Sequence, residues 1–130
     1  MELPKELYPI KTHKKSLERI LQELLWNACK YTPTGETITL AIERESNDLY
    51  RFRVINTGVE IPPGEQERVF DNFYRIPRHD PWQKGGTGLG LALVKKLVQR
   101  LGSTINLTSG NLRTEFGFSL PIYKYTLDSN

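Results

Sequence analysis

The chain has 130 residues and a mass of 15.0 kDa, with 38% hydrophobic and 25% charged residues. This length and composition predict one globular domain and argue against a disordered chain. A single cysteine, Cys29, excludes an intramolecular disulfide and a cysteine-rich zinc module. The net charge of +3 is too small to indicate nucleic-acid binding. No apolar stretch is long enough to span a membrane and no secretory signal is visible, so we expect a cytoplasmic domain without membrane contact.

The first half of the chain predicts a helix followed by two strands. Residues 1–12 are expected to be a lead-in with an edge strand near residues 7–10. Apolar residues at helical spacing predict an amphipathic helix over about residues 13–31, which ends where proline and glycine follow. Alternating apolar residues then predict strands around residues 38–42 and 50–54.

Turn residues 46–48 join these strands into a predicted antiparallel hairpin. A short helix is expected from Pro63 to about Phe70, and residues 76–86 have the proline and glycine content of a mobile loop. A second amphipathic helix is predicted over about residues 87–101. Two more strands are expected at the end of the chain, around residues 105–107 and 116–122.

Strands that follow one another directly in the sequence favour an α+β two-layer sandwich over a doubly wound parallel sheet. No repeat or flexible linker divides the chain. We therefore expect a lead-in at residues 1–12, a domain over about residues 10–122 and a tail at 123–130.

The strongest local motif is the glycine-rich run at residues 85–91, which has four glycines within six positions. Such a loop exposes backbone amides, and it opens directly into a predicted helix whose N-terminus favours an anion such as phosphate. The run lacks the Lys-Ser/Thr ending of a Walker loop, and Leu91 stands at the third glycine position of a dinucleotide motif. A tight loop that packs against the sheet is an equally good interpretation of the run alone.

The first predicted helix carries a polar stripe, because Glu23, Asn27, Lys30 and Tyr31 are spaced i, i+4, i+7 and i+8. A carboxylate and an amide oxygen one turn apart suit Mg²⁺, and a lysine one turn further suits phosphate. A solvated helix face is the alternative.

With these motifs in order, the chain resembles the catalytic and ATP-binding domain of sensor histidine kinases, in the gyrase/Hsp90/MutL-like ATPase superfamily, and it is similar to the cyanobacterial kinases. Four boxes carry the resemblance, at residues 23–32 (N), 56–62 (G1), 70–75 (F) and 85–91 (G2). The resemblance implies the Bergerat fold, a mixed, mostly antiparallel sheet packed against about three helices. It also implies ATP and Mg²⁺ as cofactors.

The resemblance gives each residue of the N box a role. Asn27 would ligate Mg²⁺, Lys30 would contact phosphate and Tyr31 would lie against the adenine. Glu23 stands where many of these kinases have asparagine, and it can be either a second metal ligand or a base that activates water.

The G1 box departs from the family pattern at two positions. Asn56 replaces the usual aspartate, which accepts a hydrogen bond from the adenine amino group, and asparagine keeps one acceptor oxygen. Glu60 replaces a glycine, and we expect it to put bulk and charge beside the nucleotide. Gly58 and Ile61 complete the G1 residues implied to contact the nucleotide.

In the F box, Arg75 resembles the arginine that reaches the γ-phosphate, so the implied catalytic residues are Glu23, Asn27, Lys30 and Arg75. Residues 76–86 would form the ATP lid. The remaining nucleotide contacts that the resemblance implies are Tyr74, Gly86, Thr87, Gly88, Leu89, Gly90, Leu91 and, from the last glycine box, Thr114.

The reaction implied is transfer of the γ-phosphoryl group of ATP to a histidine. Neither His13 nor His79 lies in a phosphoacceptor context, so the histidine is expected on a separate dimerisation domain, with a response regulator as an indirect partner. The domain alone is expected to be monomeric and to bind no nucleic acid.

Asn56 and Glu60 motivate a first alternative, a non-catalytic nucleotide-sensing module. Glu23 motivates a second, a serine kinase or ATPase of the same superfamily.

Overall fold

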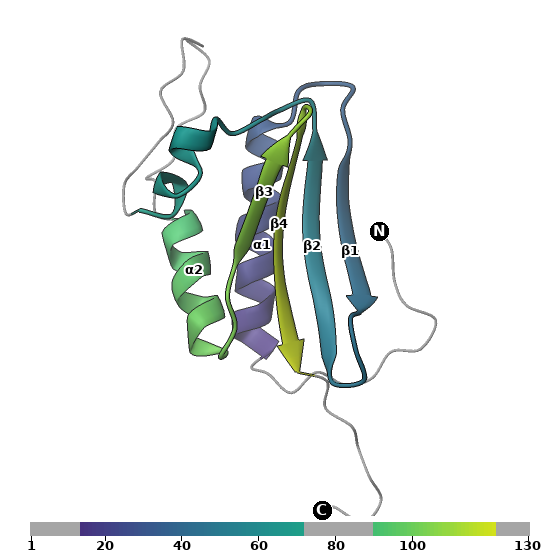
Figure 1. The fold of residues 1–130 in the computed structure, drawn as a ribbon, viewed down its shortest axis with the longest axis vertical. Helices are drawn as coiled ribbons and strands as arrows, with labels where there is room; N and C mark the ends of the chain where they lie inside the picture. The colour runs from purple at the N-terminus through teal and green to yellow at the C-terminus, as the bar shows by residue number, and fades with distance from the viewer. Residues whose placement is uncertain (1–13, 72–89, 122–130) are drawn as a thin grey trace, which may run out of the picture.

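The structure is a computed structural model that describes residues 14–71 and 90–121 (Figure 1). The predicted order of elements is confirmed within these residues. The elements are α1 (Lys14–Tyr31), β1 (Ile38–Arg44), β2 (Leu49–Thr57), the 3₁₀ helices η1 (Pro63–Glu65) and η2 (Arg68–Phe70), α2 (Gly90–Arg100), β3 (Asn106–Gly110) and β4 (Arg113–Pro121). The expected edge strand near residues 7–10, the loop at 76–86 and the first residues of the second helix lie outside the described residues.

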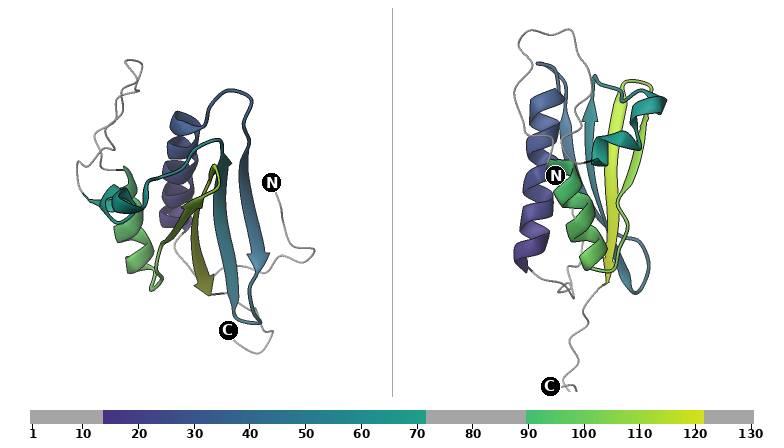
Figure 2. Two further views of the ribbon diagram at one scale, coloured as in Figure 1. Left: turned by 45° about the horizontal axis from the view of Figure 1, so that its top comes forward. Right: turned by 90° about the vertical axis from the view of Figure 1, so that its left-hand side faces the viewer.

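The four strands form one sheet in the order β1-β2-β4-β3. Every pairing among them is antiparallel, so the described sheet shows no parallel component of the mixed sheet that we expected. Both long helices cover one face of this sheet, as the side view of Figure 2 shows, and the α+β two-layer architecture is thereby confirmed. The central pair joins β2, from the first described segment, to β4, from the second.

The core lies between the helices and the covered face of the sheet. Alternation in β2 and β4 puts Phe52 and Phe118 on this face, where their rings stack with centroids 5.1 Å apart. The helical spacing of α1 brings Ile20 and Leu24 onto the same core, and each is almost fully buried. Neither described helix is both long enough and apolar enough to cross a membrane.

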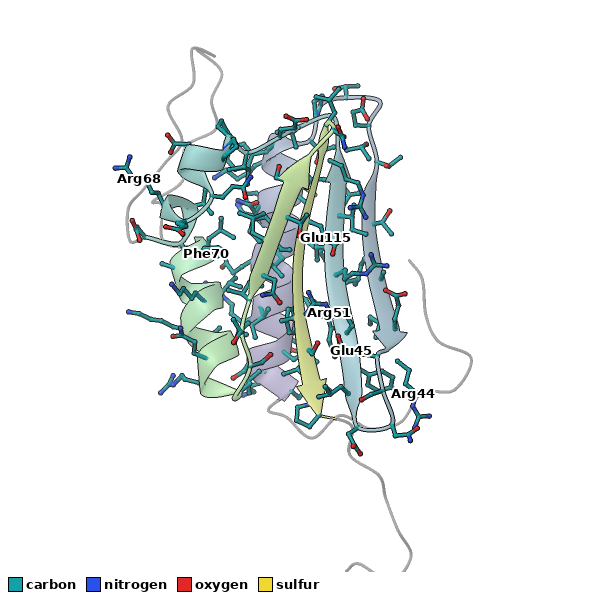
Figure 3. All side chains as sticks on the ribbon, viewed as in Figure 1. Arg44, Glu45, Arg51, Arg68, Phe70 and Glu115 are labelled. Atoms are coloured by element: carbon teal, nitrogen blue, oxygen red, sulfur yellow. The ribbon has the colours of Figure 1, made fainter. Side chains whose placement is uncertain are left out.

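The predicted short helix after Pro62 consists of two separate 3₁₀ turns. The segment has too few apolar residues to form one amphipathic helix, and only Val69 is buried in it. Phe70 nevertheless anchors the second turn, because its ring meets the edge of Phe116 at a centroid distance of 5.9 Å. This anchor places η2, which ends at the first residue of the F box, beside the start of α2 (Figure 3).

The face of the sheet opposite the helices is polar and carries a connected set of ion pairs. Arg53 contacts Glu43 and lies 3.2 Å from Glu115, which also pairs with Arg113 at 3.1 Å. Burial alone would lower the pKa of Arg53, but its hydrogen bond to Glu43 and the charge of Glu115 outweigh this and raise that pKa above its ordinary value. The carboxylates therefore hold a permanently charged arginine on the sheet face opposite α1 and α2.

Candidate functional site

Those predicted site residues that the structure describes come from elements that meet toward one end of the molecule. The C-terminal end of α1, the C-terminal end of β2, the start of α2 and the β3–β4 turn all lie toward the upper end in Figure 1. Antiparallel pairing of β2 with β4 sets this arrangement, because it puts the end of β2 beside the start of β4. Residues far apart in the sequence thus form one neighbourhood.

The polar stripe of α1 is half-buried at Glu23, Asn27 and Lys30. Glu23 connects the stripe to the glycine-rich run. One of its carboxylate oxygens pairs with Arg19 at 2.9 Å, and the other lies only 2.8 Å from the position a Cβ would take on Gly90. The N box and the end of the G2 box are therefore in contact, through a glycine that leaves room for the carboxylate.

The cationic end of the stripe lies over an aromatic ring. Lys30 Nζ is 5.4 Å from the centroid of the Tyr31 ring, a cation–π distance. The two residues assigned to phosphate and adenine are thus adjacent in space as well as in sequence.

Asn56 is buried with 5% of its surface exposed, directly opposite Thr114 in the β2–β4 register. The Thr114 hydroxyl donates to Val59 O at 3.0 Å. Asn56 lies at the C-terminal end of β2, toward the same end of the molecule as the C-terminal end of α1 and the start of α2. Asn56 is therefore a good candidate for contact with a ligand.

Gly58 and Ile61 stabilise the backbone that follows β2. Gly58 has φ +81°, and a Cβ there would lie 2.5 Å from Glu36 Cγ, so both conformation and space require glycine. The Ile61 N–H donates to Ser109 Oγ at 2.8 Å. These contacts fix the backbone that follows Asn56.

Glu60, which we expected to put bulk and charge beside the nucleotide, has a hydrogen-bond partner within the protein. Its side chain is directed to the β3–β4 turn, where Oε1 accepts a hydrogen bond from the Leu112 N–H at 2.5 Å. The sequence did not indicate this partner, because Leu112 lies 52 residues further along the chain.

Six of the predicted site residues lie outside the described residues, namely Tyr74, Arg75, Gly86, Thr87, Gly88 and Leu89. Of the other G2 residues, Gly90 begins α2 and Leu91 packs against the core. The assignments of the six stay predictions.

The oxygen ligands available for a metal are few in the described part of the chain. There is no group of three or more His, Cys, Asp or Glu side chains there that could hold an ion. Glu23 and Asn27 supply one carboxylate and one amide oxygen, which fits Mg²⁺ because this ion usually keeps several waters and takes other ligands from substrate phosphates.

Sequence reasoning also missed a shallow hollow of about 600 Å³ beside α1. Its described lining is Gln22, Glu23, Leu25, Trp26 and Cys29. Trp26 is 65% exposed, and helical spacing from the buried positions could have indicated that it faces outward. Among these described lining residues only Glu23 belongs to the predicted site, so we do not place the nucleotide in the hollow.

Comparison with known proteins identifies the class. Residues 12–124 match the family model of the histidine kinase-, DNA gyrase B- and HSP90-like ATPases, and the chain belongs to this family. Among sensor kinases it is 36% identical over 102 residues to WalK of Bacillus subtilis (strain 168), covering 78% of this chain and 16% of WalK. It is 32% identical over 129 residues to the adaptive-response sensory kinase SasA of Gloeothece citriformis (strain PCC 7424), covering 95% of this chain and 31% of SasA.

The fold agrees with these sequence relationships. Full-length ShkA, solved in complex with AMPPNP, superimposes with a TM-score of 0.75 at 29% identity, covering 92% of this chain and 24% of that one. Within the ATPase family, the chain is therefore a catalytic and ATP-binding domain of the sensor histidine kinase type. It spans less than a third of the length of WalK or SasA.

Proposed function

We propose that the chain binds Mg-ATP and transfers its γ-phosphoryl group to a histidine on a separate dimerisation domain of the same kinase. The observation that carries this proposal is the meeting at one end of the molecule of the α1 stripe, the end of β2 with its buried Asn56, and the start of α2, where Glu23 lies against Gly90. The AMPPNP complex of ShkA supports adenine nucleotide as the ligand.

Each described site residue has a distinct task in this proposal. Asn56 accepts a hydrogen bond from the adenine amino group, while Lys30 neutralises phosphate charge. Asn27, with Glu23, supplies oxygen ligands for Mg²⁺, which would neutralise charge on the phosphates when bound. In the transfer, the bond between the γ-phosphorus and the ADP oxygen breaks and a bond to an imidazole nitrogen forms, so the protein mainly positions the reactants.

The proposal is tested by binding and then by transfer. We expect AMPPNP to bind the wild-type chain in Mg²⁺ by calorimetry, and Asn27→Ala to weaken this at least tenfold while leaving the fold intact. Gln22→Ala, an exposed position on the same helix, is the control and should bind like the wild type. Wild-type affinity in Asn27→Ala would contradict the metal assignment.

Transfer is measured with an added dimerisation domain, the partner we propose for this domain. Radiolabel from ATP should appear on that domain and should be lost in acid, because phosphohistidine is acid-labile. Acid-stable label would favour the serine-kinase alternative. Release of phosphate without label would favour an ATPase, in which Glu23 acts as a base beside Gly90.

Tight binding without transfer would favour the non-catalytic module. Glu60, one of the two residues that motivate this alternative, accepts a hydrogen bond from the Leu112 N–H. A response regulator remains an indirect partner in the proposal, because it would take the phosphoryl group from the dimerisation domain.

A further inference from the structure

The two-residue turn between β3 and β4 has an unusual backbone. Gly110 pairs with Arg113, and between them Asn111 and Leu112 have φ values of 53° and 55°. This pair of positive φ angles is typical of a type I′ turn, whose second position usually holds glycine. Leucine is disfavoured there, and its side chain is 63% exposed, so packing offers little compensation.

Hydrogen bonds from a distant segment stabilise this turn. The Leu112 N–H donates to Glu60 Oε1 at 2.5 Å, and the Leu112 carbonyl accepts from the Gly58 N–H at 2.8 Å. A carboxylate acceptor makes a stronger hydrogen bond than a neutral one. Both backbone groups of the strained residue are thus bonded to residues 58–60.

A second set of contacts joins the same segment to the strands of the hairpin. The Ile61 N–H donates to Ser109 Oγ, which lies 2.8 Å from Thr114 Oγ1. The Thr114 hydroxyl in turn donates to the carbonyl of Val59. Residues 58–61 are therefore fastened to the β3–β4 hairpin at four of their polar groups, and Glu60 supplies the only side chain among them.

We propose that Glu60 is a positioning residue for the nucleotide site. Its carboxylate holds residues 58–61 against the β3–β4 turn and so fixes the direction in which Asn56, two residues before this segment, presents its amide. Glu60 does this without contacting the nucleotide. The inference rests on the proposed ATP-binding function and adds a residue that sets the affinity.

Two variants of Glu60 and two controls test the proposal. Glu60→Ala removes the acceptor, while Glu60→Gln keeps an amide oxygen in its place. Glu67→Ala removes an exposed glutamate that makes no capping hydrogen bond. Leu112→Gly keeps both backbone hydrogen-bonding groups of the turn and removes only the side chain.

The measurements are hydrogen exchange at the Leu112 amide and calorimetric affinity for AMPPNP in Mg²⁺. In Glu60→Ala we expect exchange at Leu112 to become at least tenfold faster and affinity to fall about five- to tenfold. Glu60→Gln should keep most of the exchange protection and most of the affinity, because its amide oxygen can still accept the hydrogen bond from the Leu112 N–H. Glu67→Ala and Leu112→Gly should bind nucleotide like the wild type.

The outcomes separate this inference from the proposed function. Wild-type affinity in a folded Glu60→Ala variant would overturn the positioning role, even if the variant melted at a lower temperature. An equal loss of affinity in Leu112→Gly would overturn it too, because the hydrogen bond would then not be the cause. A wild-type chain that binds no AMPPNP would instead refute the proposed function.

Discussion

Asn56 is the residue at which a change of one side-chain atom would test the proposed nucleotide site most directly. Asparagine offers a neutral oxygen where aspartate offers a charged one, and a charged acceptor makes a hydrogen bond about twice as strong. The position is 5% exposed, so bulk water screens the difference little. The amide also has an N–H donor, which a carboxylate lacks.

Asn56→Asp should tighten the binding of adenine nucleotides by about 1 kcal/mol, roughly fivefold. The binding of GTP should be unaffected or become weaker. Calorimetry with AMPPNP and the matching guanine analogue in Mg²⁺ measures both. Asn47→Asp, in the exposed β1–β2 turn, adds the same charge elsewhere and should change neither affinity. If Asn56→Asp binds both nucleotides like the wild type, then Asn56 does not contact the base.

At the scale of elements, the spacing of apolar residues and the turn residues were enough to predict the described α-helices and strands. Their apolar positions, such as Ile20 in α1 and Phe118 in β4, repeat clearly along the chain. The two 3₁₀ turns were not predicted, because residues 63–70 have no strong period. The Glu60–Leu112 contact could not be predicted either, since it depends on a pairing between residues 52 positions apart.

The same limit applies to the candidate site. The family resemblance predicted which residues belong together, and the contact of Glu23 with Gly90 agrees with it. Spacing along the chain could not show that the Thr114 hydroxyl is used by Val59, because backbone partners carry no sequence signal.

The ion pairs on the sheet face opposite α1 and α2 can be tested by removing Arg53. Arg53→Met leaves Glu43 and Glu115 without their shared cation, and we expect the free energy of unfolding to fall by about 1 kcal/mol. Urea unfolding measures this, and 1 M salt should reduce the difference. Lys14→Met is the control, since Lys14 lies 4.0 Å from Glu18 with 90% of its side chain exposed and should cost almost nothing. A loss that salt does not change would indicate packing instead of charge.

At the scale of the molecule, stability depends on the single layer of core between helices and sheet. Phe118 has no exposed surface and stacks on Phe52, so Phe118→Ala should cost roughly 3–5 kcal/mol of unfolding free energy. Thermal and urea unfolding followed by circular dichroism measure the loss. Trp26→Ala removes a larger but 65% exposed side chain and should stay within about 0.5 kcal/mol of the wild type. Equal losses in the two variants would contradict this description of the core.

The pairing of β2 with β4 makes the domain a candidate for fragment complementation. A cut between residues 72 and 89 gives two peptides, each with one helix followed by one hairpin, and each with its central strand lacking a neighbour. A lone hairpin with one helix exposes its apolar face and is at best marginally stable, so we expect each peptide alone to remain largely unfolded. When the two peptides are mixed or co-expressed, they should reassemble through this strand pair and recover nucleotide binding. The thermal unfolding midpoint of the reassembled domain should then depend on peptide concentration. The intact backbone would then serve chiefly to raise the local concentration of one half around the other.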